Sequence, residues 1–158
     1  MHFYQCSSMM KKTLLITGAS SGIGAATARL CSQLGATLVI NGRDTERLQA
    51  TIQSLHGTGH LQIAGDLTDP DTQQKLIEVN AGYDGVAACA GTCALAMLKQ
   101  ANRNHLQQML DVNYLAPVTL IQQLLRKRQL HSNASVVFIT TIGAHTCPQA
   151  TAGYAASK

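Results

Sequence analysis

Short apolar runs alternate with amphipathic stretches along almost the whole chain, and this alternation limits the folds that the chain can adopt. The runs are apolar mostly at consecutive positions, which is typical of strands buried on both faces of a parallel sheet. They cover residues 13–17, 37–40, 61–64, 85–89 and 135–140. The pattern predicts an α/β fold with a doubly wound parallel sheet and right-handed crossovers.

Amphipathic stretches at helical spacing connect the expected strands: residues 23–34, 44–55, 70–79 and about 101–129. Gly35 is placed to end the first helix in a left-handed conformation. Asp69 can cap the third helix, with Pro70 in its first position. We expect the long helical region to bend near Pro117, because a proline ring disturbs a helix interior.

The composition fits one globular domain, because 46% of the 158 residues are apolar, 13% are charged and no apolar run is long enough to span a membrane. The formal charge is +4, and the densest basic cluster, residues 126–128, is expected at a helix C-terminus. Aromatic residues make up 4% and Trp is absent, which leaves no stacking platform for nucleic acid. We therefore expect neither a nucleic-acid nor a membrane partner. Residues 1–11 are expected to form a tail, with Met1, Met9 or Met10 as the true start.

The five cysteines are odd in number, unpaired in spacing and not preceded by a signal peptide. This usage predicts free thiols in a reducing cytoplasm. Cys89 and Cys93 are isolated from histidines in the sequence, and the six histidines form no familiar ligand set. We expect no metal site.

A glycine-rich loop follows the first expected strand and opens directly into a helix: Thr17-Gly18-Ala19-Ser20-Ser21-Gly22-Ile23-Gly24. Gly18 permits a tight turn, Gly22 lets the backbone approach a pyrophosphate, and Gly24 allows close packing of helix and strand. The helix N-terminus faces the negative charge. Because strand, loop and helix occur in this order, the sequence predicts dinucleotide binding rather than a flexible loop.

Tyr154 and Lys158 lie four residues apart, so a helix would place both side chains on one face. A lysine ammonium beside a phenol suits the reduction of a ketone. Taken alone, however, the spacing is explained more simply by two polar residues on a solvated helical turn. Its interpretation depends on the rest of the chain.

Together, the Gly-x-x-x-Gly-x-Gly loop and the Tyr154-x-x-x-Lys158 pair resemble the short-chain dehydrogenase/reductase family, from about Lys12 to Lys158. The resemblance implies a Rossmann fold and an oxidoreductase that transfers hydride between a nicotinamide cofactor and a carbonyl or alcohol substrate. It also implies a set of cofactor-binding residues: Gly18, Ser20, Ser21, Gly22, Ile23, Gly24, Asp66, Leu67, Ala90 and Gly91. Asp66 corresponds to an Asp that hydrogen-bonds the adenine amino group in this family.

Two positions depart from the family pattern. Residues 88–91 read Ala-Cys-Ala-Gly where the family often has Asn-Asn-Ala-Gly, so an Asn that braces the sheet centre is missing and we expect lower stability. The position 13 residues before Tyr154, where the family has its catalytic Ser, is Thr141. A Thr hydroxyl can donate to a substrate oxygen, but its methyl group and stiff χ1 restrict its direction. Thr140 is the alternative donor.

The resemblance assigns further roles in catalysis. Asn113 matches the Asn that holds a water linking the Lys to solvent in this family, and the alternative is an ordinary polar residue within a helix. Tyr154 would protonate the substrate oxygen while Lys158 favours the phenolate. Thr141 would polarise the carbonyl.

Cofactor choice is indicated after the second strand, where an acid would bind the ribose hydroxyls of NAD. Asn41-Gly42-Arg43 offers no acid and one cation suited to a 2′-phosphate. We therefore expect NADP(H) to be preferred over NAD(H). A solvated surface charge is the alternative role for Arg43.

Members of the family continue well beyond the catalytic Lys, so the resemblance predicts that the C-terminal part of the fold is missing. A catalytically silent dinucleotide-binding fragment is therefore an alternative to an enzyme, and residues 135–140 should form an exposed edge strand. The substrate stays open, since reductases of 3-oxoacyl carrier-protein, steroid or sugar ketones would look similar. The family resemblance also predicts a homo-oligomer for a full-length protein.

Overall fold

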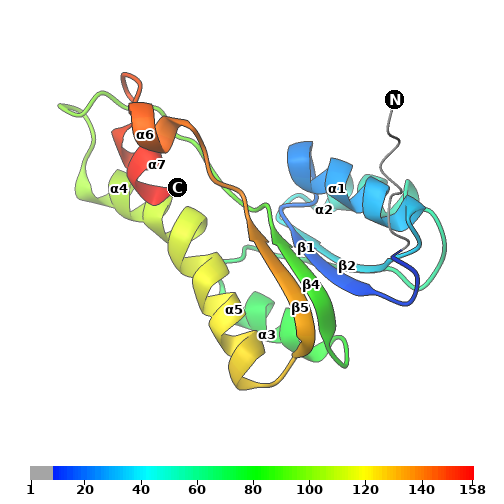
Figure 1. Cartoon of the computed structure of the whole chain (residues 1–158). Helices are drawn as coiled ribbons and strands as arrows, with labels where there is room; N and C mark the ends of the chain where they lie inside the picture. Colours follow the sequence, from blue (N-terminus) through cyan, green and yellow to red (C-terminus); the bar gives the residue numbers. More distant parts are fainter. Residues whose placement is uncertain (1–8) are drawn as a thin grey trace, which may run out of the picture.

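The computed structural model describes residues 9–158, which form a five-stranded parallel sheet with helices on both faces (Figure 1). The strands are β1 (Thr13–Thr17), β2 (Thr37–Gly42), β3 (Leu61–Ala64), β4 (Tyr83–Ala88) and β5 (Leu130–Phe138). Their order across the sheet is β3-β2-β1-β4-β5, so the chain winds outward from β1 in both directions. The doubly wound fold predicted from the sequence is confirmed.

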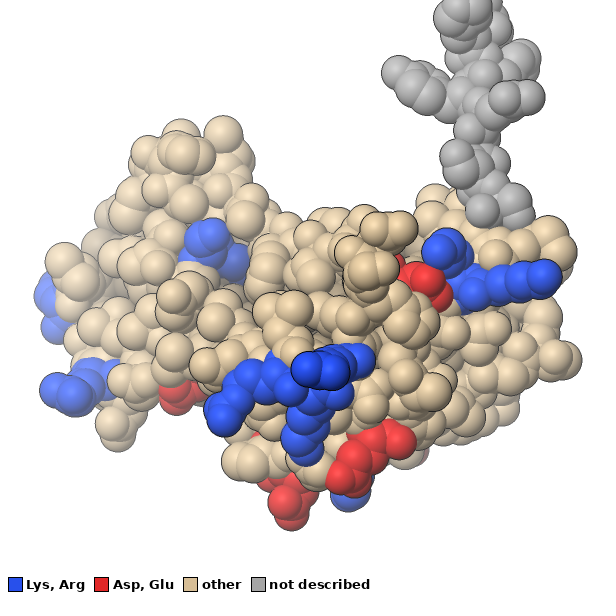
Figure 2. Space-filling view, turned by 60° about the horizontal axis from the view of Figure 1, so that its bottom comes forward, with Lys and Arg blue, Asp and Glu red and all other residues tan. Residues whose placement is uncertain are grey.

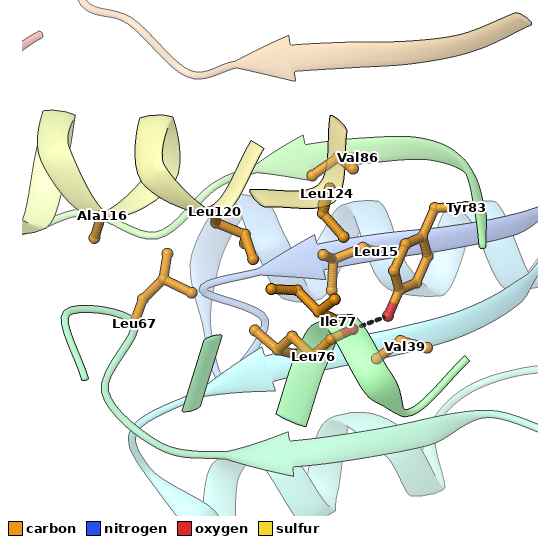
Figure 3. Packing of buried hydrophobic residues seen from close by; sticks show 10 residues of the cluster. All are labelled: Leu15, Val39, Leu67, Leu76, Ile77, Tyr83, Val86, Ala116, Leu120 and Leu124. Carbon is orange, nitrogen blue, oxygen red and sulfur yellow. Dashed lines mark hydrogen bonds between the residues drawn. The ribbon is translucent and has the colours of Figure 1, made fainter. Parts of the chain in front are cut away.

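Two helices cover each face of the central strands. Leu15 of β1 packs in a cluster with residues of α3 (Pro70–Glu78) and α5 (Ala116–Arg126), which Figure 3 shows from close by. The next residue, Ile16, packs on the other face, against α1 (Gly22–Gln33) and α2 (Thr45–Gln53). Both side chains are fully buried. Burial on both faces explains why the strands are apolar at consecutive positions.

The helix ends follow the expected local chemistry. Gly35 has φ +92°, and its N–H donates to the Ser32 carbonyl to close α1. Asp44 and Asp69 cap α2 and α3, because each carboxylate accepts a main-chain N–H of the first turn. Pro70 opens α3 as predicted.

The long helical region is interrupted rather than simply bent. Helix α4 (Arg103–Leu110) runs into a π-helical turn, η1 (Asp111–Leu115), before α5 begins at Ala116. The Ala116 N–H donates to the Asp111 carbonyl, five residues back. Pro117 has no N–H to give to Asn113, four residues back, so the wider turn lies where an α-helical ladder would fail.

The strand bounds of the second half were predicted less well. Strand β4 begins at Tyr83 instead of residue 85, and β5 spans Leu130–Phe138 instead of residues 135–140. Tyr83 pairs with Leu130, and the register shifts between Tyr83 and Gly85. Strand β5 forms the expected edge of the sheet, with Val137 and Phe138 exposed.

The amino ends of three strands are joined by one carboxylate. Asp84 of β4 accepts the main-chain N–H of Thr13 at 2.8 Å and the Lys12 ammonium at 2.9 Å. His131 of β5 approaches the same carboxylate at 3.3 Å. The hydrogen bond from Thr13, followed by that from Lys12, lowers the pKa of Asp84 to about 2.

The first described residues pack against the domain. Met9 contacts the apolar cluster that contains Ile16, and its N–H donates to the Leu34 carbonyl at 2.9 Å. The remainder of the expected tail, residues 1–8, lies outside the described residues. On the face drawn in Figure 2, Lys and Arg side chains fall into separate groups with uncharged surface between them. Within residues 9–158, no helix has the length and apolar character needed to cross a membrane.

Candidate active site

A cleft lies along the carboxyl ends of β1 to β4, where the loops that leave the sheet meet. All eleven residues predicted to bind the cofactor line it: Gly18, Ser20, Ser21, Gly22, Ile23, Gly24, Arg43, Asp66, Leu67, Ala90 and Gly91. They come from the loop and first helical turn after β1 and from the loops after β2, β3 and β4, which parallel pairing brings to one edge of the sheet. Asn41, Gly42, Gly65, Cys89 and Val112 complete the lining.

The three glycines of the first loop have different surroundings. Gly18 has φ +66°, and a Cβ there would lie 2.7 Å from the backbone of Ala90. A Cβ on Gly24 would lie 2.4 Å from the Gly18 carbonyl oxygen, so α1 could not pack as closely on the loop. A Cβ on Gly22, at φ +52°, would meet no atom within 4 Å. The space beside Gly22 is therefore open to a ligand at the N-terminus of α1.

The floor of the cleft is the segment after β4. The Ala90 N–H donates to the Thr17 hydroxyl at 3.1 Å, which fixes this segment to the end of β1. Cys89 occupies one of the positions where the family often has Asn, and burial raises the pKa of its thiol. Its half-buried side chain packs against the apolar cluster that contains Cys31.

The end of β2 carries no acid, and its polar residue is already engaged. Asn41 is 2% exposed, and its side-chain amide donates to the carbonyls of Ile63 at 3.0 Å and Gly65 at 3.2 Å. It therefore ties β2 to the loop that follows β3. Arg43, two residues on, is exposed, and its guanidinium lies 3.7 Å from the Asp66 carboxylate.

A second cavity lies between the π-helical turn, the end of β5 and α7 (Ala152–Ser157). Asn113 and Lys158 line it, together with Thr140, the alternative hydroxyl donor. Gly91 of the first cavity lies close to two residues of the second, because a Cβ on Gly91 would lie 3.0 Å from the Lys158 ammonium and 3.2 Å from the Asn113 amide oxygen. The predicted cofactor residues and two of the predicted catalytic residues are thus neighbours.

The side chain of Asn113 is 7% exposed and fully engaged. Its oxygen accepts the Thr92 N–H at 2.8 Å, and its nitrogen donates to the Thr92 carbonyl at 2.9 Å and to the Ser157 hydroxyl at 2.8 Å. The Ser157 hydroxyl in turn donates to the Tyr154 carbonyl at 2.9 Å. Ser157 was not predicted as a site residue.

Lys158 reaches back across the end of β5, where its ammonium donates to the Ile139 carbonyl at 3.1 Å. Burial lowers the pKa of this ammonium, while the nearby Cys89 thiol acts in the opposite direction. The predicted helix around Tyr154 forms, but it spans Ala152–Ser157, so Lys158 directly follows its last residue.

Thr141 and Tyr154 line neither of these cavities. Thr141 follows β5, and its hydroxyl oxygen accepts the Gly143 N–H at 3.2 Å, which leaves the hydroxyl proton free to be donated. Tyr154 lies in α7 and is half-buried. The structure therefore groups Asn113 with Lys158 but does not bring the four predicted catalytic residues into one cavity.

Some site residues carried no recognisable signal in the sequence. Ser157 and Val112 sit next to predicted residues, but their roles depend on contacts with other parts of the chain. Asn41 was noted only because it is not an acid. Within residues 9–158, no three His, Cys, Asp or Glu side chains gather in a way that could hold a metal ion.

The chain is similar to a curated reductase and to solved structures. It is 28% identical over 147 residues to the 3-oxoacyl-[acyl-carrier-protein] reductase of Rickettsia prowazekii, a match that covers 93% of this chain and 61% of that protein. A solved short chain dehydrogenase/reductase family protein is 30% identical, with a TM-score of 0.84 and coverage of 96% of this chain and 64% of its own. The glucose/ribitol dehydrogenase-type short-chain dehydrogenase/reductase of Brucella melitensis is 26% identical, with a TM-score of 0.90 and coverage of 96% and 66%.

The solved structures share the fold described above. The chain spans less than two thirds of the length of the curated relatives it matches first. The model of the short chain dehydrogenase family matches residues 12–158, which is nearly the whole chain. The chain therefore belongs to the short chain dehydrogenase family.

Proposed function

We propose that this chain carries the cofactor-binding and catalytic residues of an NADP(H)-dependent oxidoreductase acting on a carbonyl or alcohol substrate. One observation carries the proposal: Gly91, at the end of the dinucleotide cleft, lies directly against Lys158 and Asn113. One end of a cofactor bound in the cleft would therefore lie beside Lys158 and Asn113, two of the residues proposed to take part in proton transfer.

The cleft suits a dinucleotide. The open space beside Gly22 and the N-terminus of α1 would hold the pyrophosphate, and Asp66 and Leu67 would hold the adenine. Ala90 and Gly91 would allow close approach of the nicotinamide half. When bound, the cofactor would supply or accept the hydride.

The proton would be handled by the chain's own side chains. Tyr154 would give a proton from its phenol to the substrate oxygen, and Thr141 would donate a hydrogen bond to that oxygen. Lys158, four residues after Tyr154, would supply a positive charge to the site. The side-chain amide of Asn113 is already hydrogen-bonded. The main-chain carbonyl of Asn113 would therefore hold the water, because Pro117, four residues on, has no N–H to donate to that carbonyl.

Preference for NADP(H) is supported by the end of β2. The end of β2 has no acid for the ribose hydroxyls. Asn41 cannot bind them either, because it is buried and its side-chain amide already donates to two carbonyls. Arg43 stands at the rim with an exposed guanidinium. Titration of the chain with NADPH and NADH should give tighter binding of NADPH, and tighter binding of NADH would refute this preference.

The relatives suggest where to look for the substrate and the assembly. Because the chain resembles 3-oxoacyl-[acyl-carrier-protein] reductases, β-keto thioesters are the first ketones to test. Exposed Leu115, Val118 and Leu125 on η1 and α5 support the proposal of a homo-oligomer, which light scattering would measure. The four described cysteines are free thiols, which fits the proposal of a cytoplasmic protein.

Turnover of the purified chain tests the proposal. With NADPH and a panel of ketones, we expect the absorbance of the reduced nicotinamide to fall. The rate of this fall should be about 100-fold or more lower in Tyr154→Phe. Ser132→Ala, which removes an exposed hydroxyl from β5 at a position that lines neither cavity, is the control and should keep the activity. Equal rates for wild type and Tyr154→Phe would contradict the role of Tyr154.

A second function, silent dinucleotide binding, is favoured by the fact that Thr141 and Tyr154 line neither cavity. It predicts that NADPH binds but that no ketone is reduced at any pH. Turnover by the purified chain would exclude it. Binding without turnover would exclude the oxidoreductase function for this polypeptide.

A further inference from the structure

Two oppositely charged side chains lie together at the adenosine end of the cleft. Arg43 is in the loop after β2, and Asp66 is in the loop after β3. These strands pair in parallel with Gly42 opposite Ala64, so the two loops leave the sheet side by side. One guanidinium nitrogen of Arg43 lies 3.7 Å from one carboxylate oxygen of Asp66. Both residues line the dinucleotide cleft and the smaller recess beside it.

The carboxylate of Asp66 has a fixed orientation. Its other oxygen accepts two hydrogen bonds from Thr68, one from the main-chain N–H at 2.9 Å and one from the hydroxyl at 2.8 Å. Partial burial acts to raise the pKa of Asp66, but the Thr68 hydrogen bonds and the Arg43 charge outweigh it, so the pKa lies below its usual value. The group is therefore a fixed negative charge at neutral pH.

Arg43, by contrast, has little to hold it in place. Its side chain is 60% exposed, and within residues 9–158 Asp66 is the only acid at ion-pair distance from it. The neighbouring acid, Asp44, is paired with Arg47 at 3.2 Å and caps α2. The direction of the Arg43 guanidinium thus depends on the charge of Asp66.

The separation of 3.7 Å is longer than a hydrogen bond. The attraction therefore orients the guanidinium while its N–H donors stay available to another anion. A free arginine side chain has many rotamers, and binding an anion requires most of them to be given up. A guanidinium already held over the cleft loses less freedom when a phosphate arrives.

We infer that Asp66 is a positioning residue for Arg43 and thereby helps to determine specificity for the 2′-phosphate of NADP(H). This inference rests on the proposed dinucleotide-binding function and adds a second residue to cofactor selection. The carboxylate also repels a 2′-phosphate, but both groups face solvent, where ions screen such repulsion. Orientation of Arg43 outweighs it.

Adenosine 2′,5′-bisphosphate and 5′-AMP separate this role from adenine binding. Both probes carry the same adenine, so a contact between adenine and Asp66 cancels in the ratio of their dissociation constants. We expect Asp66→Asn and Asp66→Ser to lower the preference for the 2′-phosphate about two- to fivefold, as measured by calorimetry at fixed salt. In an Arg43→Gln background, the same substitutions should leave the ratio unchanged. Asp71→Asn removes one charge from the first turn of α3 and is the matched control.

Four results would overturn the inference, and the first three are an unchanged ratio, a preference that rises because Asp66 competes for Arg43, and no binding of either nucleotide by the wild-type chain. A loss of preference that persists without Arg43 would also overturn it. The proposed oxidoreduction can fail on its own. In that case no ketone is reduced, but the preference for the 2′-phosphate and its dependence on Asp66 are still measured.

Discussion

The side-chain amide of Asn113 donates to the Ser157 hydroxyl at 2.8 Å, which joins the π-helical turn to the last helix. Ser157 is 4% exposed, and its hydroxyl donates a hydrogen bond to the Tyr154 carbonyl. A helix of six residues has little stability of its own, so this contact matters for where α7 lies. The position of Tyr154 and Lys158 therefore depends on a residue that no motif singles out.

Ser157→Ala should destabilise the attachment of α7, because the buried Asn113 donor loses its acceptor. We expect a loss of about 1–3 kcal/mol in the free energy of unfolding. Urea denaturation measures it, with Ser132→Ala on the exposed part of β5 as the control. If both variants unfold alike, the contact does not anchor α7.

Alanine at two glycines of the same loop should have different effects. Gly24→Ala places a Cβ against the Gly18 carbonyl and should cost about 1–3 kcal/mol or more of stability. Gly22→Ala meets no protein atom, so it should cost only the strain of its left-handed backbone, about 1–2 kcal/mol, while filling the space of the pyrophosphate. Thermal unfolding together with NADPH titration separates the two. A folded Gly22→Ala variant that binds NADPH normally would argue against the pyrophosphate position.

Acid should weaken the domain through Asp84. Its pKa is lowered to about 2 in the folded protein, below the ordinary value of 3.8, so its stabilising contribution is complete above pH 4 and is lost as the pH falls towards 2. Asp84→Asn should remove this part of the acid sensitivity and cost about 1–3 kcal/mol at neutral pH. Urea unfolding between pH 2 and 7 measures both effects. Asp71→Asn should change neither by as much.

The cysteines should react with alkylating agents at different rates. Burial raises the pKa of the Cys31 and Cys89 thiols, so fewer thiolates are present near neutral pH, whereas Cys93 and Cys147 are exposed. Peptide mass spectrometry after iodoacetamide treatment should show Cys93 and Cys147 modified first. NADPH should slow the modification of Cys89 in particular, because this residue lines the cleft. Protection of Cys147 instead would contradict the proposed cofactor position.

That Gly18, Asp66 and Gly91 share one cleft was predictable, because they follow directly from strand ends. Each of them comes shortly after an apolar run, and parallel strands bring such positions together whatever the rest of the chain does. The contact between Asn113 and Ser157 was not predictable, since it joins residues 44 apart through helices whose relative position depends on packing. The start of β5 was misplaced because Ser132 and Asn133 disfavour strands. The strand nevertheless pairs with β4 at Leu130 and again from Ser135 onward, on both sides of these two residues.

The central place of β1 sets an order of events during synthesis. One edge of β1 is completed only by β4, and Thr13 meets Asp84 across 71 residues of sequence. A ribosome adding about 5–20 residues per second needs roughly 4–14 seconds to supply that partner. During this interval the nascent chain presents an apolar strand with an unpaired edge, so chaperones would affect the yield of folded protein most strongly before β4 emerges.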